Sequence, residues 1–433
     1  MIYIEPLILL LKIQTDSYCQ NQMKTRLKKQ FLFIVPFMVI MICFFAACTK
    51  RSPIPTSTKY DAGGTGSTGK DSTAADSIAS FNGPTGVAVD VAGNIYVADY
   101  GNNEIRKIST TGIVSTLAGN GIQGSINGAG NVATFNGPTS LTVDPSGNIY
   151  VADDNNNQIR KITPAGLVST LAGSDSTGSV DGIGAAAYFF GPSGVACDAQ
   201  GNVYVADAGN NLIRMVTPAG SVTTIAGNDN PGATNGAALL AATFNNPAGL
   251  TLDKSGNIYV ADMLNNLIRK ISGGQVTTVA GSDTTASING QGTAAAFYFP
   301  NSIAADASGN LYVTEYVTDL IRKIDPNGNV TTFAGNGNAG QADSTGIAAS
   351  FNGPSGIAVD ATGNVYVADT YNNVIRKITP AGVVSTIAGS GSVGSINGKA
   401  LSATQRKRTS SINTVKKASS KTLFNIFVRK RPQ

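Results

Sequence analysis

Short apolar runs alternate with turn-forming residues along most of this chain. In the first clear example, residues 86–90 form an apolar run, a Gly-Asn turn follows, and residues 95–99 form a second run that is apolar at successive positions. Two further runs follow at 104–108 and 113–118, each after a turn that contains glycine. Short runs rich in Val, Ile, Thr and Tyr, bounded by Gly and Asn, predict β-strands joined by hairpins. This stretch therefore predicts one four-stranded antiparallel sheet.

The same pattern of strands and turns occurs six times. The copies open with the strings Phe81-Asn82-Gly83-Pro84, Phe135-Asn136-Gly137-Pro138, Phe190-Gly191-Pro192, Phe244-Asn245-Asn246-Pro247, Phe297-Tyr298-Phe299-Pro300 and Phe351-Asn352-Gly353-Pro354. Their prolines are 53 to 55 residues apart. A period of this size with strand content is typical of a propeller or a solenoid.

A propeller explains the repeats better than a solenoid does. Propeller blades pack face to face, which accounts for a second strand that is apolar on both faces. A solenoid needs distinct capping repeats, whereas the first and last copies here are like the middle ones. We therefore predict an all-β fold, a six-bladed β-propeller of four-stranded antiparallel blades, over residues 81–404.

Charge and composition exclude several functions. The 433-residue chain has a net charge of +5, but residues 81–389 carry 12 basic and 21 acidic side chains, a net charge of −9. Nucleic-acid binding needs basic residues clustered on the folded surface, so we expect no nucleic-acid partner. The chain contains no histidine, which excludes Ser-His-Asp and Cys-His nucleophiles.

The two ends differ in composition from the repeats. Basic residues precede an apolar stretch at 31–45 that ends in Ala46-Ala47-Cys48, so residues 1–48 are expected to contain an upstream extension and a secretory signal. The signal's end resembles the lipobox of bacterial lipoproteins, which implies lipidation of Cys48 and a membrane-anchored location in the cell envelope, at the outer membrane or periplasmic face. Residues 49–80 are rich in Ser, Thr and Gly and predict a flexible linker.

The C-terminal end interrupts the pattern. The string Gly394-Ser395-Ile396-Asn397-Gly398 copies the one at 124–128, but no seventh opening string follows it. Residues 405–433 form a basic tail without acidic residues, which we expect to be disordered. Such a tail could bind an anionic surface, or it could follow a disrupted reading frame in a longer repeat protein.

The long repeated motif resembles a known family. The string Gly-(Val/Ile)-Ala-Val-Asp-x-x-Gly-Asn-(Ile/Val)-Tyr-Val-Ala-Asp-x-x-Asn-Asn-x-Ile-Arg-Lys-Ile is similar to the NHL repeat and covers residues 81–389. Glu315 and Thr318-Asp319 depart from it in the fifth copy, and Met215 does so in the third. The long Gly-rich linkers between copies resemble those of teneurins and of bacterial surface proteins. The resemblance implies a β-propeller that carries NHL repeats.

Two kinds of polar residue recur in nearly every copy. The acidic set comprises Asp99, Asp153, Asp207, Asp262 and Asp369, and the basic set comprises Arg106, Arg160, Arg214, Arg269, Arg322 and Arg376. A ring of charges around a central channel is one interpretation. The other is structural: each Asp caps its turn and each Arg connects neighbouring blades through charge-assisted hydrogen bonds. Equivalent residues in six copies favour the structural role, since one active site needs residues that differ between blades.

A propeller enzyme is the alternative to a binding protein. The resemblance to propeller lyases implies zinc held by histidines, which this chain lacks. Lactonases on six-bladed propellers hold a divalent metal with Glu, Asn and Asp side chains, and the repeats contain only Glu104 and Glu315 as glutamates. A divalent cation on oxygen ligands stays possible, but we expect no cofactor and no catalytic residue.

The variable positions indicate where binding occurs. The loops between the second and third strands lie on one face of a propeller, together with the connections between blades. Candidate binding residues in these loops are Tyr100, Asp154, Met263, Leu264, Tyr316 and Tyr371. Exposed aromatic and large apolar residues favour a contact surface, although burial under the long linkers is an alternative. We therefore predict non-catalytic recognition of a protein or glycan partner at the cell surface.

Overall fold

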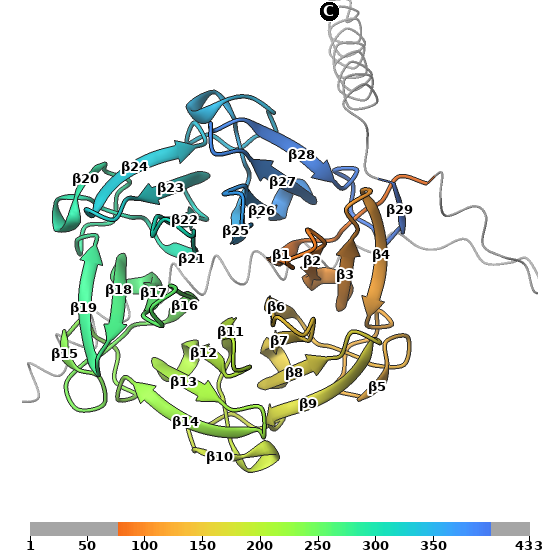
Figure 1. Ribbon diagram of the computed structural model, residues 1–433, viewed down its shortest axis with the longest axis horizontal. Helices are drawn as coiled ribbons and strands as arrows, with labels where there is room; N and C mark the ends of the chain where they lie inside the picture. The colour runs from red at the N-terminus through yellow and green to blue at the C-terminus, as the bar shows by residue number, and fades with distance from the viewer. Residues whose placement is uncertain (1–76, 400–433) are drawn as a thin grey trace, which may run out of the picture. The chain divides into compact units, whose positions relative to one another are not determined.

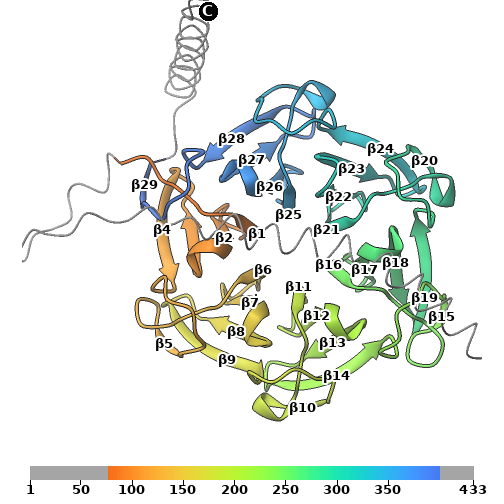
Figure 2. The same cartoon turned by 180° about the vertical axis from the view of Figure 1, so that it is seen from behind.

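The computed structural model describes residues 77–399 as six antiparallel sheets arranged around a central axis (Figures 1 and 2). This confirms the predicted all-β, six-bladed propeller, and we number the blades 1 to 6 in chain order. Cys48, the tail at 405–433 and all but residues 77–80 of the predicted linker lie outside the described residues. The first strands surround the axis and are β1 (Pro84–Val89), β6 (Pro138–Val143), β11 (Pro192–Cys197), β16 (Pro247–Leu252), β21 (Pro300–Ala305) and β25 (Pro354–Val359).

The second and third strands form the interior of each blade. The second strands are β2 (Ile95–Asp99), β7 (Ile149–Asp153), β12 (Val203–Asp207), β17 (Ile258–Asp262), β22 (Leu311–Glu315) and β26 (Val365–Asp369). All residues of β2, β7, β22 and β26 are buried, as expected for strands that are apolar on both faces. The third strands are β3 (Glu104–Ile108), β8 (Gln158–Ile162), β13 (Leu212–Val216), β18 (Leu267–Ser272), β23 (Leu320–Ile324) and β27 (Val374–Ile378).

The outer edge of most blades has one strand more than the sequence predicts. The fourth strands are β4 (Ile113–Ala118), β9 (Leu167–Gly173), β14 (Ser221–Ala226), β19 (Gln275–Ala280), β24 (Asn329–Ala334) and β28 (Val384–Ala388). In five sheets a two-residue strand from a linker pairs with the fourth strand. These short strands are β5 (Gly128–Ala129), β10 (Gly182–Ile183), β15 (Gly236–Ala237), β20 (Gly290–Gln291) and β29 (Gly398–Lys399). The linkers therefore cover sheet edges that would otherwise be unpaired.

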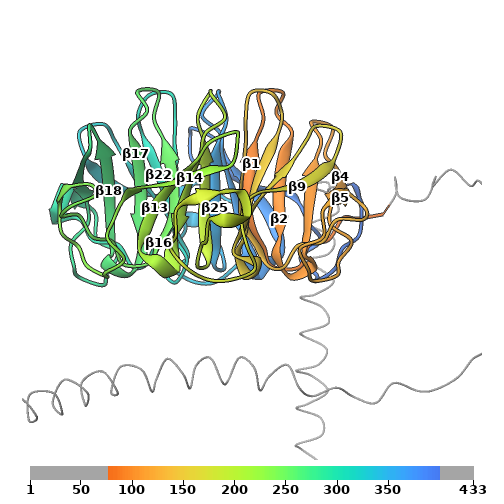
Figure 3. The same cartoon turned by 90° about the horizontal axis from the view of Figure 1, so that it is seen from below.

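Hydrophobic clusters lie between adjacent blades. One cluster contains Tyr96 and Ile105 of blade 1 together with Leu141 and Val151 of blade 2, and the other five pairs of adjacent blades share equivalent clusters. Each blade thus buries both faces of its sheet against its neighbours. The strands run between two faces that carry the turns and loops, as the edge-on view shows (Figure 3).

The last described residues close the ring at blade 1. Strand β29 pairs with β4, with Gly398 opposite Val114, just as β5 pairs with β9 in blade 2. The N–H of Ala79 donates to the carbonyl of Lys399, so both ends of the described chain meet here. The copied string at 394–398 is therefore the linker of blade 1, which accounts for it without a seventh blade.

Short 3-10 helices occupy many of the loops. Those between second and third strands are η2 (Tyr100–Asn102), η3 (Asp154–Asn156), η5 (Ala208–Asn210), η6 (Met263–Asn265) and η9 (Thr370–Asn372). Those in the linkers are η4 (Gly184–Ala186), η7 (Gly292–Ala294) and η8 (Gly346–Ala348). Within residues 77–399 no helix has the length and apolar character that crossing a membrane requires.

Candidate functional site

The recurring Asp and Arg side chains form a buried ion pair in each of five blades. In blade 2, Arg160 Nη1 donates to Asp153 Oδ2 over 2.7 Å, and both side chains are inaccessible to solvent. The same arginine donates to Asn127 Oδ1 of the linker over 2.8 Å, and its guanidinium stacks over the Phe135 ring at 5.2 Å. Each such unit joins a third strand to a second strand, an opening Phe and the linker that covers its blade. Because it is shielded from solvent, this set of charges does not form a ring along the central channel.

The carboxylates of these pairs also organise the loops. Asp99 accepts hydrogen bonds from the Asn82 N–H over 2.8 Å and from Asn102 Nδ2 over 2.8 Å, in addition to the Arg106 contact. Burial raises the pKa of Asp99 to about 6, although these hydrogen bonds and the positive charge of Arg106 oppose the shift. A fully buried carboxyl of this kind cannot touch a ligand.

Each loop is also tied to the following blade. The residue after the 3-10 helix, such as Asn103 with φ +52°, is left-handed, a conformation that Asn tolerates well. Its side chain accepts the N–H of Gly137 in the next blade over 3.0 Å. The loop between second and third strands therefore lies beside the opening string of the next blade, on the same face of the ring.

Blade 5 replaces the Asp of this unit by Glu315, and its neighbours change with it. Glu315 Oε1 accepts from Arg322 Nη1 over 2.6 Å, while Oε2 accepts from Thr318 Oγ1 over 2.7 Å and from Ser287 Oγ. The longer carboxylate is thus matched by the shorter Thr318 where the other blades have Asn. Glu315 is fully buried in this ion pair and is not available as a metal ligand at the surface.

A second set of aspartates lies in the turns between first and second strands. Asp360 accepts from the backbone N–H and side chain of Asn364 and from the Tyr366 hydroxyl. Burial disfavours its ionised form, but hydrogen bonds from Asn364, Thr362 and Tyr366 outweigh burial and lower the pKa of Asp360 to about 2. These carboxylates stabilise their own turns on the face opposite the variable loops.

The predicted binding residues lie on one face, but they do not form one cluster. Tyr316 of blade 5 and Tyr371 of blade 6 pack with ring centroids 5.6 Å apart. Tyr371 is 51% exposed, whereas burial, together with the neighbouring Tyr371 phenol, raises the pKa of the largely covered Tyr316. Met263 and Leu264 lie together in η6 of blade 4. The structure therefore brings together the candidates of blades 5 and 6, and separately the two of blade 4.

The remaining two candidates lie on blades 1 and 2. Tyr100 is partly exposed beside Gly137, where an added Cβ would be 2.9 Å from its ring. Burial and the nearby charge of Asp153 raise the pKa of Asp154 to about 6. Among residues 77–399 the Asp154 carboxylate has no hydrogen-bond or ion-pair partner. This side of the loop face therefore carries an acidic side chain as well as the exposed Tyr100.

The opening string of the third copy begins at Phe189, one residue earlier than predicted. The Phe189 ring is fully buried under Arg214, at 5.3 Å, as the other opening rings are under their arginines. Phe190 takes the position of Asn82, and its N–H donates to Asp207 Oδ1 over 2.8 Å. Because two phenylalanines are adjacent here, the sequence alone does not show which of them aligns with the opening Phe of the other copies. The 49% exposed Phe190 side chain therefore belongs to the loop face.

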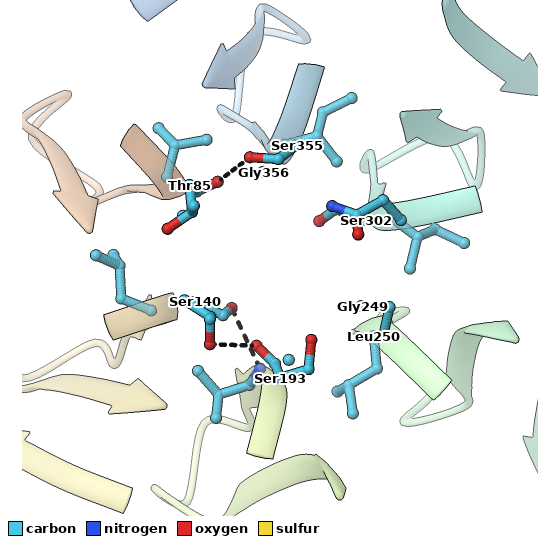
Figure 4. A pocket seen from close by; sticks show the side chains of 18 of the residues that line it. Thr85, Ser140, Ser193, Gly249, Leu250, Ser302, Ser355 and Gly356 are labelled. Carbon is cyan, nitrogen blue, oxygen red and sulfur yellow. Dashed lines mark hydrogen bonds between the residues drawn. The ribbon is translucent and has the colours of Figure 1, made fainter. Parts of the chain in front are cut away.

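A pocket of about 210 Å³ opens at the axis on the same face (Figure 4). The starts of all six first strands line it, and Tyr316 is the candidate residue that reaches it. Ser193, Ser302, Ser355 and Thr85 are among the labelled side chains around the opening. The lining carries hydroxyl, amide and apolar groups and no charged side chain. These polar residues follow the repeat prolines and were not recognised as site residues from the sequence.

Three polar side chains of the pocket lack partners in the described part of the chain. Thr85 and Thr139 donate to backbone carbonyls, and Ser355 donates to the Thr85 carbonyl over 2.8 Å. Ser193, Asn301 and Ser302 make no side-chain hydrogen bond within residues 77–399. Their donors and acceptors remain available to a ligand. In the same described range, no group of three or more His, Cys, Asp or Glu side chains is arranged to hold a metal ion.

Comparisons with known proteins agree with this architecture. The family model for the NHL repeat matches residues 81–108, 135–162, 244–271 and 351–378, which lie in blades 1, 2, 4 and 6. NHL repeat-containing protein 2 from Bos taurus is 29% identical over 335 residues, covering 68% of this chain and 46% of the relative. Teneurin-3 from Danio rerio is 31% identical over 221 residues, covering 44% of this chain and 8% of the relative. The chain thus spans less than half the length of either relative.

A solved structure shares the fold. An auxiliary nutrient binding protein from Bacteroides thetaiotaomicron superposes with a TM-score of 0.52 and 16% sequence identity, covering 71% of this chain and 70% of that one. At this identity the likeness concerns the fold alone. The matched segments show that the chain carries NHL repeats, and the six sheets show that it folds as a six-bladed β-propeller.

Proposed function

We propose that this propeller is a non-catalytic binding protein that recognises a protein or glycan partner through the face carrying the β2–β3 loops and their equivalents. The observation that carries the proposal is the exposed Tyr371, Leu264 and Phe190 on this face, at positions where the repeats differ. Large apolar side chains that are exposed on an otherwise polar surface are typical of contact sites. The charged residues that the repeats share are buried in ion pairs, so they support the fold.

A capture experiment with full-length protein tests this proposal. The bait is incubated with envelope proteins and glycans of the source organism, and the retained material is identified by mass spectrometry. We expect the double variant Leu264→Ser, Tyr371→Ser to lose the specific partner. Val91→Ser is the matched control, because Val91 is 98% exposed in a β1–β2 turn on the opposite face. Equal capture by the wild type and the double variant would contradict the assignment of the loop face.

We also propose that the protein is displayed on the cell envelope through a lipid on Cys48. The support is the basic region, the apolar stretch and Ala46-Ala47-Cys48 in the sequence. Metabolic labelling with a fatty-acid analogue, followed by membrane fractionation, tests it. Wild-type protein is expected to be labelled and membrane-bound, and Cys48→Ser to be neither. An unlabelled wild type would refute the anchor and leave the binding proposal intact.

A further inference from the structure

Blade 5 departs from the repeat at several positions, and these positions lie on one face. Its opening string contains Tyr298 and Phe299, its first strand continues from Pro300 with Asn301 and Ser302, and its loop carries Tyr316. Its third strand keeps the Ile-Arg-Lys-Ile sequence of blades 1, 2, 4 and 6. The changes therefore affect the loop face, and three of them line the pocket, while the third strand of the blade is unchanged. In a repeat protein, a site for one ligand requires this kind of local difference.

Phe299 adopts a backbone conformation that its side chain disfavours. Its φ is +50°, and the equivalent residues are Gly83, Gly137, Gly191, Asn246 and Gly353, all with positive φ. Gly and Asn tolerate the left-handed region, whereas an aromatic residue there is a genuine outlier. Strain of this kind clusters at functional sites, where the side chain serves a purpose other than stability. Phe299 packs edge-on against Tyr298, with ring centroids 5.0 Å apart.

The central pocket, which the chain enters at Asn301, two residues after Phe299, suits an uncharged ligand with hydroxyl groups. An ion placed there would find no opposite charge in the lining, and burying an unpaired charge is costly. The free side chains of Ser193, Asn301 and Ser302 can each donate and accept hydrogen bonds, as pairing with ligand hydroxyls requires. Leu250 and Ile303 supply apolar surface deeper in the pocket. A few polar groups over an apolar floor are typical of small-ligand sites.

We infer that blade 5 holds a neutral saccharide unit at the mouth of the central pocket. A sugar ring presents hydroxyls at its edge, for Asn301, Ser302 and Ser193, and C–H groups on its faces, for the aromatic ring of Tyr316. Phe299 belongs to the strained segment that leads into Asn301 and sets the path of the chain there. The inference rests on the proposed function and specifies its ligand class. The recognised partner is then a glycan, and the mouth of the pocket binds one of its uncharged sugar units.

Direct binding measurements with the full-length protein test this inference. The probes are maltotriose, cellotriose and chitotriose as neutral oligosaccharides, and sialyllactose as an anionic one. The protein has 14 tyrosines and no tryptophan, so tyrosine fluorescence reports on rings near the ligand, and isothermal titration calorimetry gives the Kd. We expect at least one neutral probe to bind and sialyllactose to bind at least about tenfold more weakly.

Substitutions that copy other blades separate binding from folding. Phe299→Gly restores the residue of blades 1, 2, 3 and 6, and Asn301→Ala restores Ala248 of blade 4. Each is expected to raise the Kd at least about tenfold. Phe299→Gly should melt no lower than the wild type, because it removes backbone strain. Asn155→Ala, at an exposed residue in the blade 2 loop of the same face, is the matched control and should change the Kd by less than about twofold.

The possible outcomes distinguish this inference from the proposed function. It is wrong if no neutral probe binds at about 10 mM, or if Phe299→Gly and Asn301→Ala bind as the wild type does. If that happens while partner capture still depends on Leu264 and Tyr371, the loop face binds a different class of partner and the proposed function stands. If capture is also independent of Leu264 and Tyr371, both proposals fail.

Discussion

The buried arginines matter because each neutralises a carboxylate that is shielded from solvent. Replacing Arg160 by Met would leave Asp153 without its 2.7 Å partner, and breaking such a buried pair costs about 3–5 kcal/mol. We therefore expect Arg160→Met to lower the free energy of unfolding by about this amount in chemical denaturation. Lys161→Met is the matched control, because blade 3 has Met215 at this position. We expect it to lower the free energy of unfolding by less than about 1 kcal/mol, since only the contact between Lys161 and the Tyr150 ring is lost. Equal losses would show that the pair contributes little.

The raised pKa of Asp154 predicts that this carboxyl destabilises the folded protein at neutral pH, whereas a salt-bridged carboxylate would stabilise it. Its folded-state pKa is raised to about 6 by burial and by Asp153, above the value near 4 of an unfolded chain. The folded state therefore binds this proton more tightly, and its stabilising contribution is lost as the pH rises from about 4 through 6. We expect Asp154→Asn to raise the melting temperature at pH 7.5 and to raise it less at pH 4. A gain that is independent of pH would contradict the shifted pKa.

At the scale of the blade, the substitutions in blade 5 act as a set. Glu315 reaches Thr318 and Ser287 because its side chain is longer than Asp and Thr318 is shorter than Asn. We expect each single substitution, Glu315→Asp or Thr318→Asn, to destabilise the protein. Each leaves a side chain of the wrong length opposite the unchanged residue. The double variant restores the Asp-Asn pair of the other blades and should recover part of the loss, with a coupling of about 0.5–3 kcal/mol in a double-mutant cycle. Additive losses would show that the two positions are independent.

The sequence predicts four strands of each blade well, because each is an apolar run bounded by turn residues. It does not predict the fifth. Gly128–Ala129 has no apolar alternation, and its pairing with β9 depends on residues about forty positions away. The loop-face candidates were recognisable because they vary between copies. The polar residues of the pocket were not, since Ser193 and Asn301 follow a proline in an ordinary turn context, and only the closed ring brings the first strands together.

At the scale of the whole molecule, blade 1 holds both ends of the described chain. Arg106 Nη2 donates to Asn397 Oδ1 over 2.8 Å, and Asn102 Nδ2 donates to the Gly394 carbonyl over 2.9 Å. The Arg106–Asn397 hydrogen bond is equivalent to the one between Arg160 and Asn127, but its two residues are nearly three hundred positions apart in the sequence. Blade 1 therefore receives its covering linker from the far end of the chain, which also secures its contact with blade 6.

This arrangement predicts that blade 1 depends on residues 393–399 more than any other blade does. Two truncated proteins, ending at Ser392 and at Lys399, differ only in this segment. The shorter protein loses β29 and the linker partners of Arg106, leaving the Arg106–Asp99 pair open to water at one side. We expect it to melt at a lower temperature, and hydrogen exchange to accelerate in β1 to β4 before it does in the blades farthest from the closure. Uniformly faster exchange in all six blades would instead mean that the ring opens as one cooperative unit.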